Sequence, residues 1–146
     1  MPERPERLSR AAFGLFRPIP TRWMDNDVYG HVNNVVYYSY FDTAVNAHLV
    51  DSGVLDPATS PVTGLVVETS CTYFESISFP EIVEAGIAVA ALGRSSVTYR
   101  VAIFKAGGEL AAAQGRFTHV YVDRASGRPV EIPADTRAVL EPLMGD

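Results

Sequence analysis

The stretch Arg22-Trp23-Met24-Asp25-Asn26-Asp27-Val28-Tyr29-Gly30-His31-Val32-Asn33-Asn34 lies between an apolar segment typical of a β-strand and a segment typical of a helix. It brings two carboxylates, an imidazole, a glycine and side-chain amides together at one junction. Polar groups crowded in this way are costly to fold unless they hold a turn or do chemistry. The helix that follows has free backbone N–H groups at its start, which can bind an oxyanion. A carboxylate beside such groups is what hydrolysis of an activated acyl group requires.

The segments that flank this stretch predict one strand and one long helix. Residues 13–23 are rich in apolar side chains and contain two prolines, which favours an edge strand or a bend. Residues 35–51 repeat apolar side chains at helical intervals, and Asn33 or Asn34 can cap the helix start. Apolar residues nearly encircle this helix, so we expect it to be mostly buried.

Four more strands follow in the remaining sequence, separated by glycine-rich and proline-rich turns. Their ranges are 62–75, 81–92, 96–105 and 110–122, and a short helix is predicted from residue 133 to residue 143. A run of strands beside one buried helix predicts an α+β fold with a five-stranded antiparallel sheet packed on that helix. Such a sheet leaves exposed edges, so we expect dimerisation through an edge strand.

Length and composition favour a single folded domain. The 146 residues are 47% hydrophobic, which is enough for a real core. We interpret residues 1–12 as a flexible arm and residues 13–146 as the domain. Twelve basic against seventeen acidic residues argue against a nucleic-acid binder, and no apolar run is long enough for a membrane helix. A lone Cys71 excludes an intrachain disulfide and favours the cytoplasm.

At this point the chain resembles the hotdog-fold proteins, in which a twisted antiparallel sheet wraps around a long central helix. The pattern Arg22-Trp23-x-Asp25-x-Asp27-x-x-Gly30-His31-Val32-Asn33-Asn34-x-x-Tyr37 resembles acyl-CoA thioesterases of the 4-hydroxybenzoyl-CoA thioesterase type. The motif Gly93-Arg94-Ser95-Ser96-Val97-Thr98-Tyr99 and the turn Val122-Asp123-Arg124-x-x-Gly127-Arg128-Pro129 are also similar to that family. The resemblance covers about residues 13–140. Many relatives carry Glu where this chain has Asp42.

The resemblance implies a role for each matching residue. Asp27 is expected to act on the thioester, either as nucleophile or as the base that activates water. The backbone N–H of Asn34 is expected to bind the thioester oxygen, and His31 either polarises the carbonyl or braces the loop. Arg94, Ser95 and Ser96 are expected to contact the phosphates or the pantetheine arm of CoA.

The same resemblance implies an acyl-CoA or related thioester as substrate, with no cofactor beyond the CoA that belongs to it. We expect a homo-oligomer, either a dimer or a dimer of dimers that forms a homotetramer, with no nucleic-acid or membrane partner. The loop at Asp27 and the region at Arg94 are expected to come from different protomers of one site.

Less specific interpretations stand beside each of these roles. Asp27 could instead cap a turn through its side chain, and Asp25 is expected to be structural. A calcium loop fails because Tyr29 takes a ligand position, and a metal triad of Asp25, Asp27 and His31 is a weak alternative. Two rival functions also remain: a hotdog enoyl-thioester hydratase or dehydratase, and a non-catalytic protein that binds acyl-CoA or acyl-carrier protein.

Overall fold

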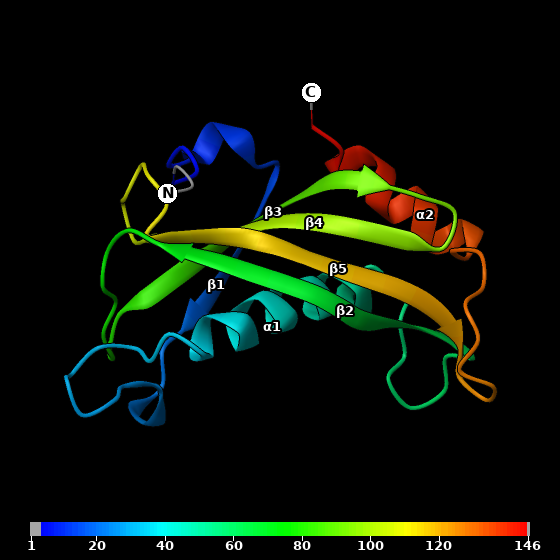
Figure 1. The fold of residues 1–146 in the computed structure, drawn as a ribbon, viewed down its shortest axis with the longest axis horizontal. Helices are drawn as coiled ribbons and strands as arrows, with labels where there is room; N and C mark the ends of the chain where they lie inside the picture. The colour runs from blue at the N-terminus through cyan, green and yellow to red at the C-terminus, as the bar shows by residue number, and fades with distance from the viewer. Residues whose placement is uncertain (1–3, 146) are drawn as a thin grey trace.

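The computed structural model describes residues 4–145, and residues 1–3 and 146 of the sequence lie outside this range. It contains a five-stranded antiparallel sheet, a long helix and a short C-terminal helix, so the predicted hotdog architecture is confirmed (Figure 1). The strands are β1 (Leu15–Pro20), β2 (Val62–Tyr73), β3 (Ile82–Leu92), β4 (Ser96–Lys105) and β5 (Ala113–Asp123), and the α-helices are α1 (Val36–Asp51) and α2 (Ala134–Leu140). Among the described residues, no helix is long and apolar enough to cross a membrane.

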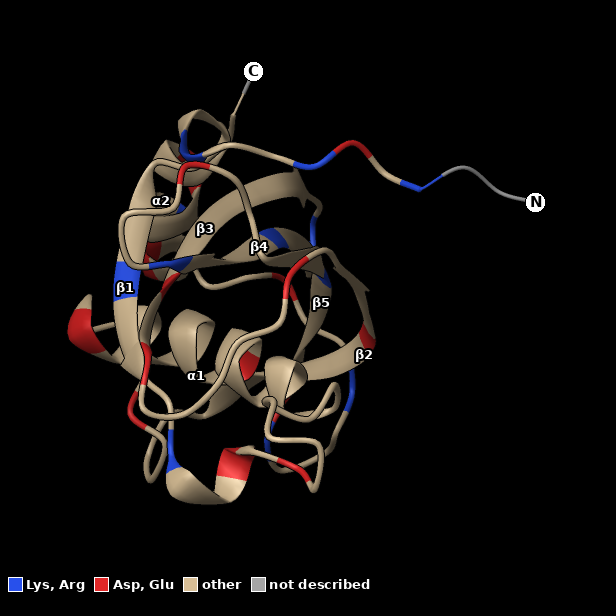
Figure 2. Ribbon diagram, turned by 90° about the vertical axis from the view of Figure 1, so that its left-hand side faces the viewer, with Lys and Arg blue, Asp and Glu red and all other residues tan. Residues whose placement is uncertain are grey.

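The sheet has the strand order β1-β3-β4-β5-β2 and curls around α1, as Figure 2 shows. The alternation in β4 produces this arrangement, because Val97, Tyr99, Val101 and Ile103 share one face and are almost completely buried. Each fully buried side chain of this size contributes about 1.5–3 kcal/mol relative to exposure. The main core therefore lies between the sheet and α1.

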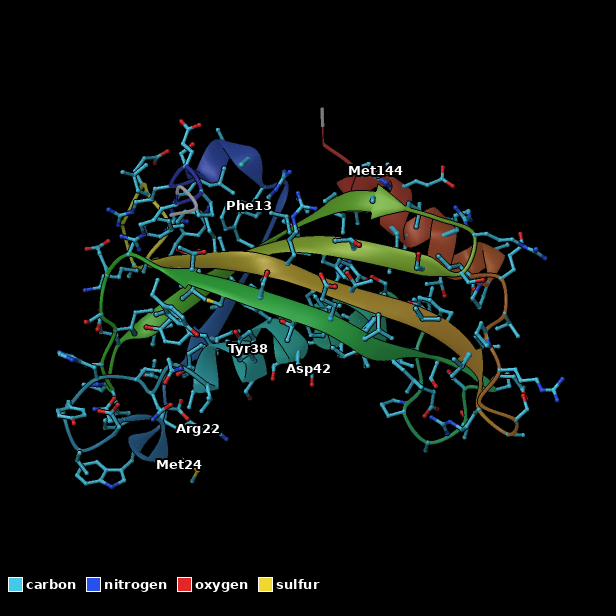
Figure 3. The ribbon with its side chains drawn as sticks, viewed as in Figure 1. Phe13, Arg22, Met24, Tyr38, Asp42 and Met144 are labelled. Atoms are coloured by element: carbon cyan, nitrogen blue, oxygen red, sulfur yellow. The ribbon has the colours of Figure 1, made fainter. Side chains whose placement is uncertain are left out.

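Only one face of α1 packs against the sheet, which corrects the expectation that the helix is mostly buried. The buried side chains recur at helical spacing and are Tyr37, Tyr40, Phe41, Ala44, Val45 and Leu49. On the other face Ser39, Asp42 and Thr43 are exposed in the protomer. Figure 3 shows Asp42 on the side of α1 that is turned away from the sheet.

The first strand is shorter than the predicted range of 13–23. Pro18 and Pro20 lack backbone N–H donors, and β1 accordingly lies at an edge of the sheet and ends at Pro20. The opposite edge is β2, which has twelve residues and no proline. Its exposed apolar side chains are Leu65, Val66 and Val67.

Residues 4–12, expected to form a flexible arm, lie instead against the sheet. The Arg10 guanidinium forms an ion pair with Glu84 at 2.9 Å and donates to the Gly108 carbonyl at 2.6 Å. The Leu8 N–H donates to Gln114 Oε1 at 2.8 Å, and Leu8 packs with Phe13 in a second apolar cluster. The partners of Leu8 and Arg10 are more than 70 residues away in the sequence, so the composition of residues 1–12 does not predict these contacts.

Candidate active site

The sequence between β1 and α1 folds into a tight hairpin. The Asp27 N–H donates to the His31 carbonyl at 2.9 Å, and the Gly30 N–H donates to the Asp27 carbonyl at 3.0 Å. Gly30 has φ +83°, a backbone conformation that residues with a Cβ rarely adopt, so this turn requires glycine. The hairpin thus holds Asp27 and His31 side by side.

The Asp27 side chain takes part in the turn that was considered as an alternative to catalysis. Its Oδ1 accepts the Tyr29 N–H at 2.9 Å. No hydrogen bond to Oδ2 occurs among residues 4–145. The turn therefore fixes the orientation of the carboxylate and leaves one oxygen able to react.

Asp25 has the structural role that was expected, with a partner that the sequence did not indicate. Its buried carboxylate accepts the Arg22 N–H at 2.8 Å and the Tyr40 hydroxyl at 2.7 Å, and it forms an ion pair with the Arg22 guanidinium at 2.9 Å. Burial alone raises the pKa of Asp25, but the hydrogen bonds from Tyr40 and Arg22 outweigh it and hold the pKa below its usual value. Because Tyr40 belongs to α1, this carboxylate ties the loop to the helix.

The start of α1 is organised by the two asparagines. Val35 is the N-cap residue of α1 and makes no side-chain cap bond, so the expectation that Asn33 or Asn34 caps the helix is wrong. Asn33 Oδ1 instead accepts the Val35 N–H at 3.1 Å in the turn that precedes the helix. The Asn34 carbonyl accepts the Tyr73 hydroxyl from β2 at 2.7 Å. Within the part of the chain that the structure describes, the Asn34 N–H has no hydrogen-bond partner.

Two neighbouring hollows flank the hairpin. One, of about 250 Å³, is lined by residues of the hairpin, α1 and β2: His31, Val32, Asn34, Tyr37, Tyr73, Phe74, Glu75 and Ser76. The other, of about 300 Å³, is lined by Trp23, Asn26, Asp27 and Phe79. Figure 3 shows Arg22 and Met24 of this loop below the start of α1. His31 and Asn34 thus share one hollow, and Asp27, whose N–H donates to the His31 carbonyl, lines the other.

Arg94, Ser95 and Ser96 lie at the opposite end of the sheet from this hairpin (Figure 1). They form the turn between β3 and β4, which is closed by a bond from the Gly93 N–H to the Ser96 carbonyl at 2.8 Å. Arg137 of α2 supports the turn by donating to the Gly93 carbonyl at 2.7 Å. The eleven residues of β3 separate the two regions by roughly 33 Å at about 3.3 Å per residue. One protomer therefore does not bring the two predicted groups together.

The other reactive side chains offer little competing chemistry. Burial raises the pKa of the Cys71 thiol to about 11, so this residue is not a thiolate at neutral pH. Residues 4–145 contain no group of three His, Cys, Asp or Glu side chains arranged to hold a metal ion. Asp25, one member of the weak metal triad, already binds Arg22 and Tyr40.

The hairpin lies within a region that matches a known protein family. A family model described as the Thioesterase-like superfamily matches residues 21–140, which includes the whole hairpin, α1 and the strands β2 to β5. The chain belongs to this superfamily. The match confirms the thioesterase resemblance at that level.

Several solved structures have a similar fold. The PA5185 protein of Pseudomonas aeruginosa strain PAO1 is 51% identical, with a TM-score of 0.94 over 96% of this chain and 98% of that one. The PA2801 protein of the same species, a proposed thioesterase, is 27% identical with a TM-score of 0.79 over 91% and 98%. The DHNA-CoA thioesterase of Staphylococcus aureus has the same fold, with 22% identity and a TM-score of 0.75 over 85% and 86%.

A curated relative extends the comparison to another bacterium. The protein YsmA of Bacillus subtilis is 24% identical over 121 residues, or 83% of this chain and 81% of that protein.

Three residues that support the predicted site residues were missed in the sequence. Tyr40 and Tyr73 hold Asp25 and Asn34, and Arg137 holds the turn at Arg94. Their contacts span 15, 39 and 43 residues of sequence, so no local motif announces them. The aromatic residues near the start of α1, which include Tyr40, were a signal in the sequence for such contacts, but they also fit an ordinary hydrophobic core.

Proposed function

We propose that this protein is an acyl-CoA thioesterase that hydrolyses a thioester to a carboxylate and free CoA. The observation that carries the proposal is the hairpin, which leaves one carboxylate oxygen of Asp27 without a hydrogen bond and leads into the unpartnered N–H of Asn34 just before α1, in a thioesterase-like chain. Neighbours of the same fold include thioesterases, which supports the same class of reaction.

In the proposed reaction the Asp27 carboxylate supplies electrons or accepts a proton, whereas the Asn34 N–H stabilises negative charge. The Asp27 carboxylate either attacks the thioester carbon, giving a mixed anhydride that water hydrolyses, or takes a proton from the attacking water. The Asn34 N–H donates to the carbonyl oxygen as negative charge develops on it. The CoA sulfur leaves as a thiolate without much help from an acid, since thiols have a pKa near ~8.5. His31 lines the same hollow as Asn34 and is the second candidate donor.

A homo-oligomer is part of the proposal. The β2 edge exposes Leu65, Val66 and Val67, whereas the β1 edge carries two prolines, so β2 is the edge that can add a second copy. In such a dimer the Arg94 turn of one protomer is available to hold CoA for a site in another. This arrangement supplies the phosphate contacts that a single protomer keeps far from Asp27.

The test is release of free thiol from acyl-CoA substrates by wild type and by Asp27→Asn. The variant keeps a side-chain oxygen for the Tyr29 N–H, so its fold and melting temperature should match wild type. Loss of the carboxylate should lower kcat by at least about a hundred-fold. Unchanged thiol release would refute the role of Asp27, and hydration of an enoyl-CoA without thiol release would favour the hydratase function instead.

A further inference from the structure

A hollow lies on the outer face of the sheet, between the N-terminal arm of residues 4–12 and the strands β2, β4 and β5. Its volume is about 310 Å³, which is at the lower end of the range for sites that bind small molecules. The polar groups in its lining include the guanidinium groups of Arg100 and Arg116 and the hydroxyls of Ser70 and Thr72. This hollow is separate from the two that flank the hairpin.

The two arginines of this hollow face each other across neighbouring strands. Arg100 of β4 pairs directly with Arg116 of β5, so both side chains leave the sheet on the same face. Like charges that are directly opposite each other destabilise paired strands. The same row of the sheet brings no negative charge, because Arg100 is next to Ala88 of β3 and Arg116 is next to Ser70 of β2. The sheet therefore holds two positive charges side by side at a cost in stability.

Two carboxylates lie nearby without neutralising the arginines. Glu68 is in the next row of the sheet, opposite Thr118, and Glu6 lines the hollow from the arm. Among residues 4–145, neither carboxylate forms an ion pair with Arg100 or Arg116. An anion that enters the hollow therefore meets two guanidinium groups whose charge is not already paired.

The arm that closes one side of the hollow is held in place by Gln114. Gln114 is only 7% exposed, and it lies two residues before Arg116 in β5. Its Nε2 donates to the Glu6 carbonyl at 2.8 Å, and its Oε1 accepts the Leu8 N–H at 2.8 Å. A buried side chain thus fixes the backbone that forms this wall of the hollow.

We propose that this hollow binds a phosphate group between the guanidinium groups of Arg100 and Arg116, with the hydroxyls of Ser70 and Thr72 as further donors. Arginine binds phosphate oxygens through paired, charge-assisted hydrogen bonds. A dianion between the two arginines also replaces their mutual repulsion by attraction to a shared partner. The site does not depend on the proposed hydrolysis. Its ligand is either inorganic phosphate or the phosphate ester of a nucleotide.

The first experiment is calorimetric titration of the protein with inorganic phosphate in a low-chloride buffer near neutral pH. Wild type should bind phosphate, and Arg100→Gln and Arg116→Gln should each weaken binding by about ten-fold or more, the worth of hydrogen bonds to a charged group. Arg128→Gln is the matched control, because it removes the same charge from an exposed arginine after β5 and should bind as wild type does. Absence of binding by wild type, or equal binding by all of these proteins, would overturn the proposal.

Glu6→Gln should act in the opposite direction. It removes a negative charge from the lining of the hollow, while the backbone carbonyl that accepts from Gln114 remains. Phosphate should therefore bind up to about five-fold more tightly, which is the usual worth of one exposed charge pair. Weaker binding by this variant would contradict the proposal.

Thermal unfolding tests the cost of the two opposed arginines. Without phosphate, Arg116→Gln should melt about 1–4 °C above wild type, because the repulsion is gone. Phosphate should raise the melting temperature of wild type more than chloride of equal ionic strength does, and it should not raise that of the variant. The same rise in both proteins would contradict the proposal. A smaller mass of Arg116→Gln in sedimentation would assign the arginines to a contact between copies, again against the proposal.

A last titration distinguishes the two sources of phosphate, with adenosine 3′,5′-bisphosphate as the probe. Binding at least about ten-fold tighter than that of inorganic phosphate, and lost in Arg100→Gln and Arg116→Gln, would identify a nucleotide ester as the ligand. Binding no tighter than that of inorganic phosphate would identify the free anion. Asp27→Asn should bind both probes as wild type does, since Asp27 lines another hollow. Bisphosphate binding that is lost in Arg94→Gln but kept in Arg100→Gln would contradict a nucleotide site in this hollow.

Discussion

Asp25 is a buried charge in a loop whose other carboxylate is the candidate catalyst. The Tyr40 hydroxyl and the Arg22 side chain both depend on it, and Tyr40 is 4% exposed. Removing one partner of such a group leaves the other without a bond in the interior. Asp25 thus stabilises the loop on which Asp27 is held.

We expect Asp25→Asn to lower the free energy of unfolding by roughly 1–3 kcal/mol at pH 7, measured by urea denaturation. The pKa of Asp25 is lower in the folded protein than in the unfolded chain, so its stabilisation is complete above the unfolded carboxyl pKa of about 3.9 and declines as the pH falls through the folded pKa. The gap between wild type and variant should therefore shrink in acid. Tyr40→Phe is the control, since it keeps the carboxylate and its ion pair with Arg22. A gap that widens toward low pH would contradict this account.

At the scale of the elements, the β2–β5 pairing holds β2 at the edge of the sheet. Gly115 of β5 pairs with Cys71 of β2. A Cβ built on Gly115 lies 1.7 Å from the Ser70 carbonyl oxygen, and a backbone atom cannot move aside cheaply. Only glycine allows the two strands to approach this closely.

Gly115→Ala should therefore lower the free energy of unfolding by about 3 kcal/mol or more, because it forces β2 away from β5. The measurement is thermal or urea unfolding. Gly14→Ala is the matched control, since a Cβ at Gly14 meets no atom within 4 Å and this backbone does not require glycine. Equal stability of the two variants would mean that the strands tolerate the added methyl group.

At the scale of the whole molecule, the exposed apolar edge of β2 decides the proposed assembly. Val67 is 60% exposed near the middle of the strand, where a two-fold axis would place it close to its own copy. Two like charges facing each other across paired strands are destabilising. A lysine at position 67 would therefore face the lysine of the second copy, and the two like charges would repel each other in the dimer.

Val67→Lys should shift the protein toward a monomer in sedimentation analysis and lower thiol release in parallel, because each site needs the second copy. Ile82→Lys replaces a comparably exposed apolar side chain at the start of β3 and should leave the assembly unchanged. If Val67→Lys has the same mass in solution as wild type, pairing through β2 is wrong.

The sequence predicted the fold because its signals are local. Alternating residues in β4 and the helical spacing in α1 each repeat within a few positions, so they report the face that is buried. The hairpin was predictable for the same reason, since Gly30 and Asp27 make their turn contacts within a few residues. Strand ends were less well predicted, because β1 stops at a proline and β5 begins only where β4 can pair with it.

The sequence by itself determined the elements, the turn that orients Asp27 and the turn at Asn33 that precedes α1, since all three depend on residues that are neighbours in the chain. Tertiary structure alone decided the anchoring of Asp25 by Tyr40, the support of Asn34 by Tyr73 and the support of the Arg94 turn by Arg137. These contacts join side chains from different strands and helices. Their partners are selected by packing in space, which the order of residues does not record.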